Sequence, residues 1–219
     1  MNLQVFIESF WKILLPGIMV TIPLTVISFS FAMIIATVTA LIQFANIKVL
    51  KELARFYIWF IRGTPLLVQL FVVFYGLPSI GITIKAIPAA IIVFSINEGA
   101  YCAETMRAAL ESIPKGQLEA GYCVGMNYVQ TIRRIVLPQA LRVAFPSLFN
   151  SLISLVKDTS LASNITVTEM MMQTRMINAK VYEALTLYLE VALIYLMFST
   201  ILTYIQRWGE KKLSTYEKH

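Results

Sequence analysis

Long uncharged stretches alternate with short charged segments along most of the chain. No charged residue occurs from Ile13 to Ile47, which exceeds the roughly 20 apolar residues that a membrane-spanning helix needs. We expect an entry segment and a first span near 18–44. Further apolar segments lie between Arg55 and about Tyr75, and at 86–109, 143–156 and 184–206. The fourth is short, which predicts a tilted or cavity-lining segment.

The composition supports a membrane protein. Hydrophobic residues make up 58% of the 219 positions and charged residues only 14%, with a mean hydropathy of +0.73. A soluble domain carries roughly 25% charged residues, so this chain cannot coat a water-soluble globule. We therefore predict an all-α integral membrane protein, with residues 1–219 forming a single domain of about five transmembrane helices.

The basic residues predict the orientation of the spans. The net charge of +6 comes largely from Lys and Arg after the first span, after the third span and at the C-terminus. Basic loops usually face the cytoplasm, where they meet an anionic leaflet. This pattern puts the N-terminus outside and the C-terminus inside, and it explains the charge through membrane lipid, with no nucleic acid as partner.

The loop at about 110–138 is the longest polar stretch on the predicted cytoplasmic side. Pro114 suits a first helical turn, and Gly125 suits a left-handed helix stop. Asn127 and Gln130 have the spacing of a capping box that opens a second helix. The loop is predicted as helix, glycine turn and helix. Such a unit is either a rigid projection that transmits force to a partner or an ordinary ordered loop.

The same loop resembles a known family. Glu119, Ala120 and Gly121 are followed at fixed spacing by Gly125, Ile135 and Leu137-Pro138. This pattern is similar to the E-A-A loop of permease subunits of bacterial ATP-binding-cassette importers, with Gly121 where the family usually has Ala. Segments 62–69, 100–104 and 114–117 are similar to the polar amino acid branch, which includes histidine, glutamine, arginine and cystine importers.

The resemblance implies a type I importer permease fold in a bacterial cytoplasmic membrane. It implies a coupling helix within 114–131 that docks on a cytoplasmic ATPase. The residues of this chain that match the family's motif, and that the resemblance assigns to the contact with the ATPase, are Glu119, Ala120, Gly121, Gly125 and Pro138. The implied partners are two ATPase subunits, a second permease (identical or a paralogue) and an extracytoplasmic substrate-binding protein. L-cystine is the first candidate substrate, and glutamine and basic amino acids are alternatives.

The sequence argues against an enzyme. It contains no phosphate-binding loop of the G-x-x-x-x-G-K-[ST] type, so a separate ATPase must use ATP and Mg²⁺. Cys102 and Cys123 have no metal-ligand spacing, and we expect this chain to hold no metal and no cofactor. The methionines at 170–172 and 176 are expected to serve packing or docking.

Charged and amide side chains within the spans are the candidate substrate contacts. Asn97 and Glu98 lie near the middle of the third span, where a charge costs about 2.5–3.5 kcal/mol on insertion scales. Glu98 could bind an ammonium group or form a structural pair with an arginine. Asp158 ends the fourth apolar segment. Arg62 and Gln69 are seven residues apart, which predicts one helical face. Arg62 could bind a carboxylate or be structural.

Two other transport mechanisms remain as alternatives at this stage. A passive channel needs a path but no rigid docking loop. An ion-coupled secondary transporter predicts inverted repeats with broken helices in both halves, and no such repeat is detectable. Glu104 and Arg107 are three residues apart and are expected to pair with each other.

Overall fold

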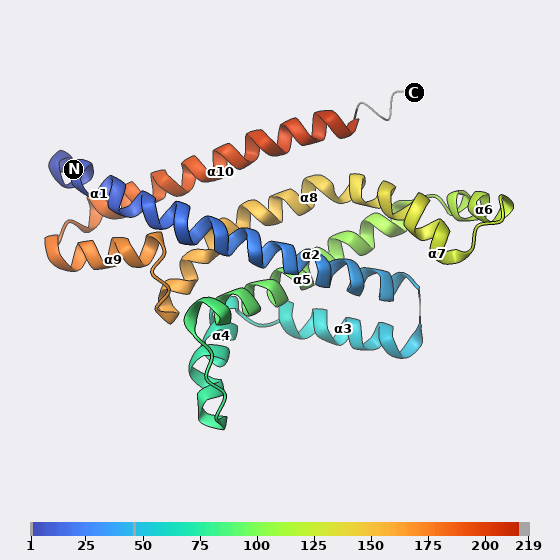
Figure 1. Ribbon diagram of the computed structural model, residues 1–219, viewed down its shortest axis with the longest axis horizontal. Helices are drawn as coiled ribbons and strands as arrows, with labels where there is room; N and C mark the ends of the chain where they lie inside the picture. Colours follow the sequence, from blue (N-terminus) through green and yellow to red (C-terminus); the bar gives the residue numbers. More distant parts are fainter. Residues whose placement is uncertain (1, 46, 215–219) are drawn as a thin grey trace. The chain divides into compact units, whose positions relative to one another are not determined.

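The computed structural model describes residues 2–45 and 47–214, and these residues fold into helices joined by short connections (Figure 1). Within these residues, four helical stretches are long and apolar enough to cross a membrane: Leu3–Phe44, Ala86–Ser112, Tyr128–Ile165 and Ala184–Leu213. A fifth span results if the bent pair Lys48–Arg62 and Leu66–Ile80 counts as one. The prediction of an all-helical protein with about five spans is confirmed.

The elements follow one another with few long loops. Their bounds are α1 Leu3–Pro16, η1 Gly17–Thr21, α2 Ile22–Phe44, α3 Lys48–Arg62, α4 Leu66–Phe71, η2 Val72–Gly76, η3 Leu77–Ile80, α5 Ala86–Ser112, α6 Lys115–Cys123, α7 Tyr128–Thr131, η4 Ile132–Val136, α8 Leu137–Asp158, η5 Thr159–Ile165, α9 Met170–Val181 and α10 Ala184–Ser214.

The chain divides into two compact units, each built from segments that are far apart in the sequence. The first combines the described parts of Met1–Ser30, Thr64–Ser95 and Leu152–Ile205. The second combines the described parts of Phe31–Gly63, Ile96–Ser151 and Gln206–His219. The long helices α2, α5, α8 and α10 contribute to both units.

The first unit holds two apolar clusters. One gathers around Leu70, Phe94 and Leu155, and the other around Ile13, Met170 and Leu187, all of them nearly inaccessible to solvent. Met170 is part of the core, whereas Met176 is 45% exposed. The expected packing role is therefore confirmed for Met170.

The first span begins earlier than the sequence suggested. The expected entry segment before residue 18 is helical, and α1, η1 and α2 form one stretch from Leu3 to Phe44. Pro16 and Pro23 flank the π-helical turn η1. Proline removes a backbone donor within a helix, and a local π-turn absorbs that irregularity without ending the helix.

The expected common face of Arg62 and Gln69 is wrong. Arg62 ends α3, Gln69 lies in α4, and the two helices are bent by 98° across Gly63, Thr64 and Pro65. The residue before a proline avoids the helical region, and Pro65 itself is extended with ψ 135°. The Gln69 amide instead donates to the Thr64 hydroxyl at 2.8 Å.

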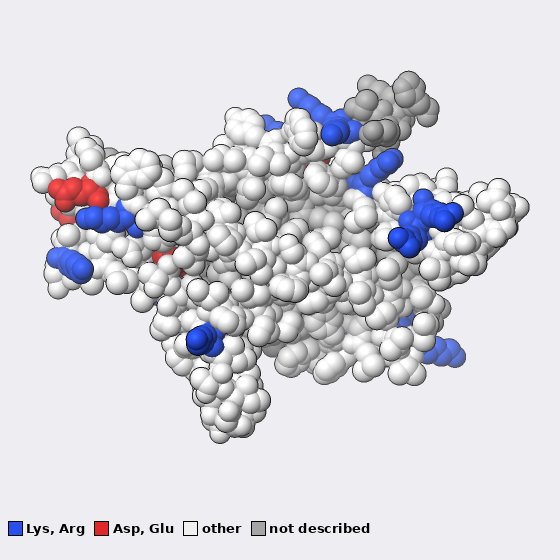
Figure 2. Space-filling view, in the orientation of Figure 1, with Lys and Arg blue, Asp and Glu red and all other residues white. Residues whose placement is uncertain are grey.

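The fourth span is longer than its 14 uncharged residues indicate. α8 is 22 residues long and lies within a helical stretch that runs from Tyr128 to Ile165. The charged residues at both ends of the apolar segment are helical too, so the apolar count underestimates the helix. Figure 2 shows that most of the visible face is uncharged, as expected for a protein whose helices contact lipid.

Candidate functional site

The polar loop within the second unit has the predicted helix–turn–helix form. α6 ends at Cys123, and Gly125, two residues further on, is left-handed with φ +80°. The Met126 N–H donates to the Gly121 carbonyl at 3.0 Å, and the Gly125 N–H donates to the Tyr122 carbonyl at 3.0 Å. These are the two bonds of a Schellman helix stop, which needs a residue that tolerates positive φ. Figure 1 shows α6 and α7 at the ends of α5 and α8.

A capping box opens the second helix of the loop. The Gln130 N–H donates to the Asn127 side chain at 2.9 Å, and the Asn127 N–H donates to the Gln130 side chain at 3.0 Å. Two of the backbone donors that the start of α7 would otherwise leave free are thereby satisfied. The loop ends are fixed by hydrogen bonds, so the loop is a rigid unit.

Gly121 lies where the two helices of the loop touch. A Cβ atom at this position would lie 2.6 Å from both branches of the Thr131 side chain. Thr131 is fully buried, and its hydroxyl donates to the Asn127 carbonyl at 3.0 Å. The departure from the usual alanine therefore has a local cause, because Thr131 fills the space that an alanine methyl group would need.

The outer surface of the loop is apolar in part. Tyr122, Val124 and Val129 are exposed by 49%, 74% and 70%. Glu119 and Ala120 are exposed as well, whereas Gly121 is buried against Thr131. Exposed apolar groups on a rigid polar loop are typical of a surface that binds another protein.

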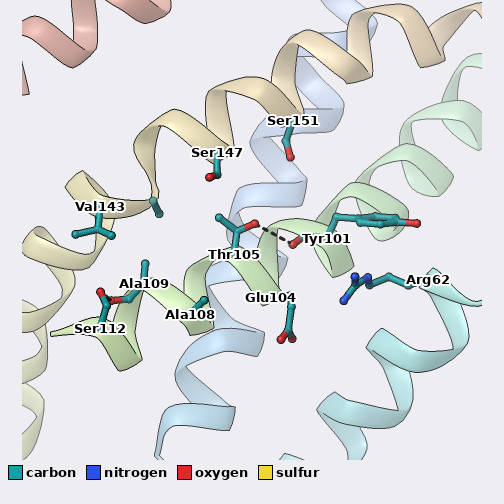
Figure 3. Close-up of a pocket in the computed structure, with 11 residues that line it drawn as sticks. Arg62, Tyr101, Glu104, Thr105, Ala108, Ala109, Ser112, Val143, Ser147 and Ser151 are labelled. Carbon is teal, nitrogen blue, oxygen red and sulfur yellow. Dashed lines mark hydrogen bonds between the residues drawn. The ribbon is translucent and has the colours of Figure 1, made fainter.

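A cleft of about 520 Å³ lies between α5 and α8 in the second unit, with Arg62 from α3 at its edge (Figure 3). Its volume falls in the usual range for small-molecule sites, roughly 300–1,000 Å³. It is lined by Arg62, Tyr101, Glu104, Thr105, Ala108, Ala109, Ser112, Val143, Ala144, Ser147 and Ser151.

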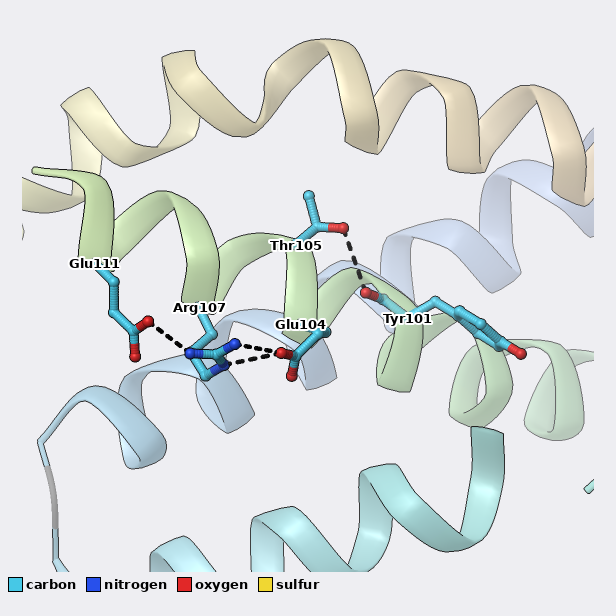
Figure 4. Close-up of polar contacts among 5 residues, drawn as sticks. All are labelled: Tyr101, Glu104, Thr105, Arg107 and Glu111. Atoms are coloured by element: carbon cyan, nitrogen blue, oxygen red, sulfur yellow. Dashed lines mark hydrogen bonds and ion pairs between the residues drawn. The ribbon is translucent and has the colours of Figure 1, made fainter. Parts of the chain in front are cut away.

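Two charged residues line the cleft, Arg62 from α3 and Glu104 from α5, and further charged residues of α5 lie beside it. The Arg62 guanidinium lies over the Tyr101 ring at 5.1 Å from its centroid. The Arg107 guanidinium binds Glu104 through two nitrogens and donates to Glu111 at 2.6 Å (Figure 4). The predicted pair of Glu104 and Arg107 is confirmed, and Glu111 extends it.

The binding residues predicted from the sequence do not gather at one site, and only Arg62 among them lines the cleft. Asn97 and Glu98 are each 7% exposed on α5, and the Cys102 thiol donates to Glu98 at 3.5 Å. Gln69 and Asp158 belong to the first unit.

Sequence reasoning missed most of the cleft. Tyr101, Thr105 and Ser112 lie on α5, and Ser147 and Ser151 lie on α8. Their spacings of four and seven residues put each set on one helical face, which is the signal that could have found them. A search for charged residues does not select single hydroxyl groups in an apolar helix.

Among the residues that the structure describes, no cluster of three His, Cys, Asp or Glu side chains could hold a metal ion.

Comparisons with known proteins agree on one class of protein. The family described as binding-protein-dependent transport system inner membrane component matches residues 44–215. The L-cystine transport system permease protein TcyB of Bacillus subtilis (strain 168) is 47% identical over 210 residues, covering 95% of this chain and 90% of its own. The probable amino-acid ABC transporter permease protein YckA of the same strain is 39% identical, covering 98% and 95%.

Solved structures give the same picture. A crystal structure of an amino acid ABC transporter with histidines superposes with a TM-score of 0.82 at 30% identity, covering 95% of this chain and 94% of the other. A chain of the inward-facing MetNI methionine ABC transporter has a TM-score of 0.79 at 18% identity, with coverage of 94% and 98%, and shows the shared fold alone.

Proposed function

The chain belongs to the family of binding-protein-dependent transport system inner membrane components, and we propose that it is the membrane-spanning subunit of an ATP-driven importer of polar amino acids. It is a multi-pass protein of the cell membrane, with the fold of an ABC importer permease. The observation that carries the proposal is the hydrogen-bonded loop from α6 to α7, which joins the two helices that line the cleft.

The loop offers a mechanism for coupling. A cytoplasmic ATPase that pushes on α6 displaces a rigid unit, because the Schellman stop and the capping box hold its two helices together. α5 enters this unit and α8 leaves it, so the two cleft walls move with the loop. Alternate exposure of the cleft to the two sides of the membrane then follows from ATP binding and hydrolysis by the partner.

The remaining parts of the importer come from other chains. Two ATPase subunits supply ATP and Mg²⁺ chemistry, a second permease completes the passage, and an extracytoplasmic binding protein delivers substrate. In this arrangement the N-terminus is outside and the C-terminus is cytoplasmic, as the basic residues favour.

The substrate is an amino acid with a free ammonium and a free carboxylate group, and L-cystine is the first candidate. A relative that is 47% identical is named an L-cystine permease, which supports this choice. Arg62 at the cleft edge suits a carboxylate, since a guanidinium can donate two parallel hydrogen bonds to it. Asn97, Glu98, Asp158 and Gln69 remain candidate contacts along the path.

Uptake in a deletion strain tests the proposal. The strain is complemented with the wild type or with Gly125→Val, and uptake of labelled L-cystine, L-glutamine and L-arginine is measured. A β-branched residue at φ +80° costs of order 1–3 kcal/mol and distorts the helix stop, so uptake should fall while the protein stays in the membrane. Gly116→Ala is the control, because a Cβ there meets nothing within 4 Å. Unchanged uptake of all three amino acids on deletion contradicts the assignment.

A further inference from the structure

One carboxyl group of the first unit lies within the apolar cluster around Ile13, Met170 and Leu187. Glu190 has no solvent-accessible surface, and Leu187 and Val191 on the same side of α10 belong to this cluster. An ionised carboxylate in such surroundings is costly unless a cation or several hydrogen-bond donors replace the lost water. The groups around Glu190 therefore decide whether it carries a charge.

Helix α1 supplies one polar partner. Ser9 is only 2% exposed, and its Oγ lies 2.5 Å from Oε2 of Glu190. Figure 1 shows α1 beside the first turns of α10. The second carboxyl oxygen of Glu190, Oε1, is buried and has no hydrogen-bond partner in the described part of the chain. A charge on this carboxylate would have a single hydroxyl group to compensate for it.

Glu190 forms no ion pair with any residue that the structure describes. The other titratable side chains on the elements around it are Glu8, Lys12, Lys157, Asp158, Glu169, Arg175, Lys180, Tyr182, Glu183, Tyr188 and Tyr195. Only Glu169 among them is fully buried, and its oxygens accept hydrogen bonds from the Met171 and Met172 amides and the Tyr195 hydroxyl. The surroundings thus favour the neutral form of Glu190.

The hydrogens around Ser9 point the same way. Its Oγ also lies 2.6 Å from the Val5 carbonyl oxygen, which has no hydrogen to offer, so the Ser9 hydroxyl donates there. The single hydrogen of this hydroxyl cannot also lie along the 2.5 Å line to Glu190, as a hydrogen bond of that length requires. The hydrogen in the second contact must therefore come from the carboxyl group.

We propose that Glu190 and Ser9 form a proton-binding site, and that the bound proton fastens α1 to α10. The neutral Glu190 acid donates to Ser9, and Ser9 donates to the Val5 carbonyl. Without the proton, one of these two short contacts has no hydrogen, and a charge remains in the apolar core. Since α1 also packs on α9, release of the proton loosens the packing of both helices.

Infrared difference spectroscopy of the full-length permease in lipid nanodiscs tests the proton directly. Glu190→Gln keeps the shape of the side chain and offers an amide donor to Ser9, so it imitates the protonated acid at every pH. At neutral pH, wild type minus Glu190→Gln should show the carbonyl band of a protonated carboxyl and no carboxylate bands, because all other carboxyl groups cancel. Glu8→Gln is the matched control. This exposed residue adjoins Ser9 on α1, and its replacement should leave the acid band unchanged.

Ser9→Ala gives a second spectroscopic test that leaves Glu190 in place. The variant removes the acceptor of the acid hydrogen but not the acid itself. The acid carbonyl band should therefore persist and move to higher frequency, which appears in the wild type minus Ser9→Ala spectrum as a paired positive and negative signal.

Hydrogen exchange measures the effect of the proton on α1. In the wild type, protection of the α1 amides should fall in alkaline medium, beyond the change in intrinsic exchange rate, by about two- to twelvefold, the usual effect of one hydrogen bond. Glu190→Gln should keep this protection at every pH, and Ser9→Ala should show the reduced protection throughout.

Three results would overturn the proposal. The first is a wild type minus Glu190→Gln spectrum with carboxylate bands and no acid carbonyl band. The second is an equal pH dependence of α1 protection in the wild type and in Glu190→Gln. The third holds even if Glu190→Gln does not fold, and it is an acid carbonyl band that Ser9→Ala fails to shift.

Discussion

Replacing Gly121 by alanine should loosen the coupling loop, although alanine is the better helix former. The added Cβ would lie 2.6 Å from Oγ1 and Cγ2 of Thr131, whereas ordinary contacts start near 3.4 Å. The two helices must therefore separate by about 0.8 Å, or Thr131 must turn. Turning brings no relief, because both branches face Gly121 and the hydroxyl would lose its bond to the Asn127 carbonyl.

Two free-energy terms decide whether Gly121→Ala stabilises or destabilises the loop. Overpacking of this kind costs about 1–3 kcal/mol. Alanine in place of a helical glycine returns about 0.5–1 kcal/mol. With mid-range values of about 2 and about 0.75 kcal/mol, the net loss is about 1.2 kcal/mol in the stability of the loop (about 0–2.5 kcal/mol over the full ranges), which lowers the equilibrium constant for closure roughly eightfold.

Hydrogen exchange measures this loss locally. The Gly125 and Met126 amides report on the loop, since both donate to carbonyls of α6. Their protection should fall by the stated factor in Gly121→Ala and should recover when Thr131→Ala is added. Gly116→Ala is the matched control on the same helix, where the new methyl group meets no atom and protection should rise slightly. Equal or greater protection in Gly121→Ala with Thr131 intact would refute the packing argument.

Two further predictions concern the first unit. Burial raises the pKa of the Glu169 carboxyl, an effect that hydrogen bonds from the Met171 and Met172 amides and from the Tyr195 hydroxyl offset only in part. The folded state then holds this proton more tightly than the unfolded state, so the contribution of Glu169 to stability is full at acid pH and declines as pH rises through the raised value. Glu169→Gln should remove this component from the pH dependence of thermal unfolding, and an unchanged difference curve would contradict it. In addition, Gly17→Ala should lower the melting temperature in detergent, because its Cβ would lie 2.6 Å from the sulfur of the core residue Met170, and an unchanged melting temperature would show that this contact relaxes freely.

The elements that sequence reasoning predicted well are those set by local chemistry. Gly125 is left-handed as expected, and Asn127 and Gln130 form both hydrogen bonds of the capping box. These features depend on residues close together in the chain. The long apolar segments likewise predicted the helices, although helix ends extend beyond them because charged residues can be helical at a membrane surface.

Of the elements that it missed, one had a local signal and the others depend on tertiary arrangement. The bend at Pro65 removed the expected common face of Arg62 and Gln69, and its signal was local, because proline keeps the residue before it out of the helical region. The spacing of Ser147 and Ser151 puts them on one face of α8, but that this face meets α5 across a cleft is a tertiary feature (Figure 3). The reason for Gly121 is equally non-local, because Thr131 lies ten positions further along and on the other helix.

The central claim is that this chain is a passage whose motor is another polypeptide, joined through the loop from α6 to α7. The most direct measurement is uptake of labelled L-cystine into proteoliposomes that contain the permease, its ATPase and its binding protein. Uptake is compared with and without ATP on the side of the membrane where the ATPase lies. The account predicts uptake that requires ATP and is lost in Gly125→Val. Equal uptake without ATP, or full ATP-dependent uptake by Gly125→Val, would contradict it.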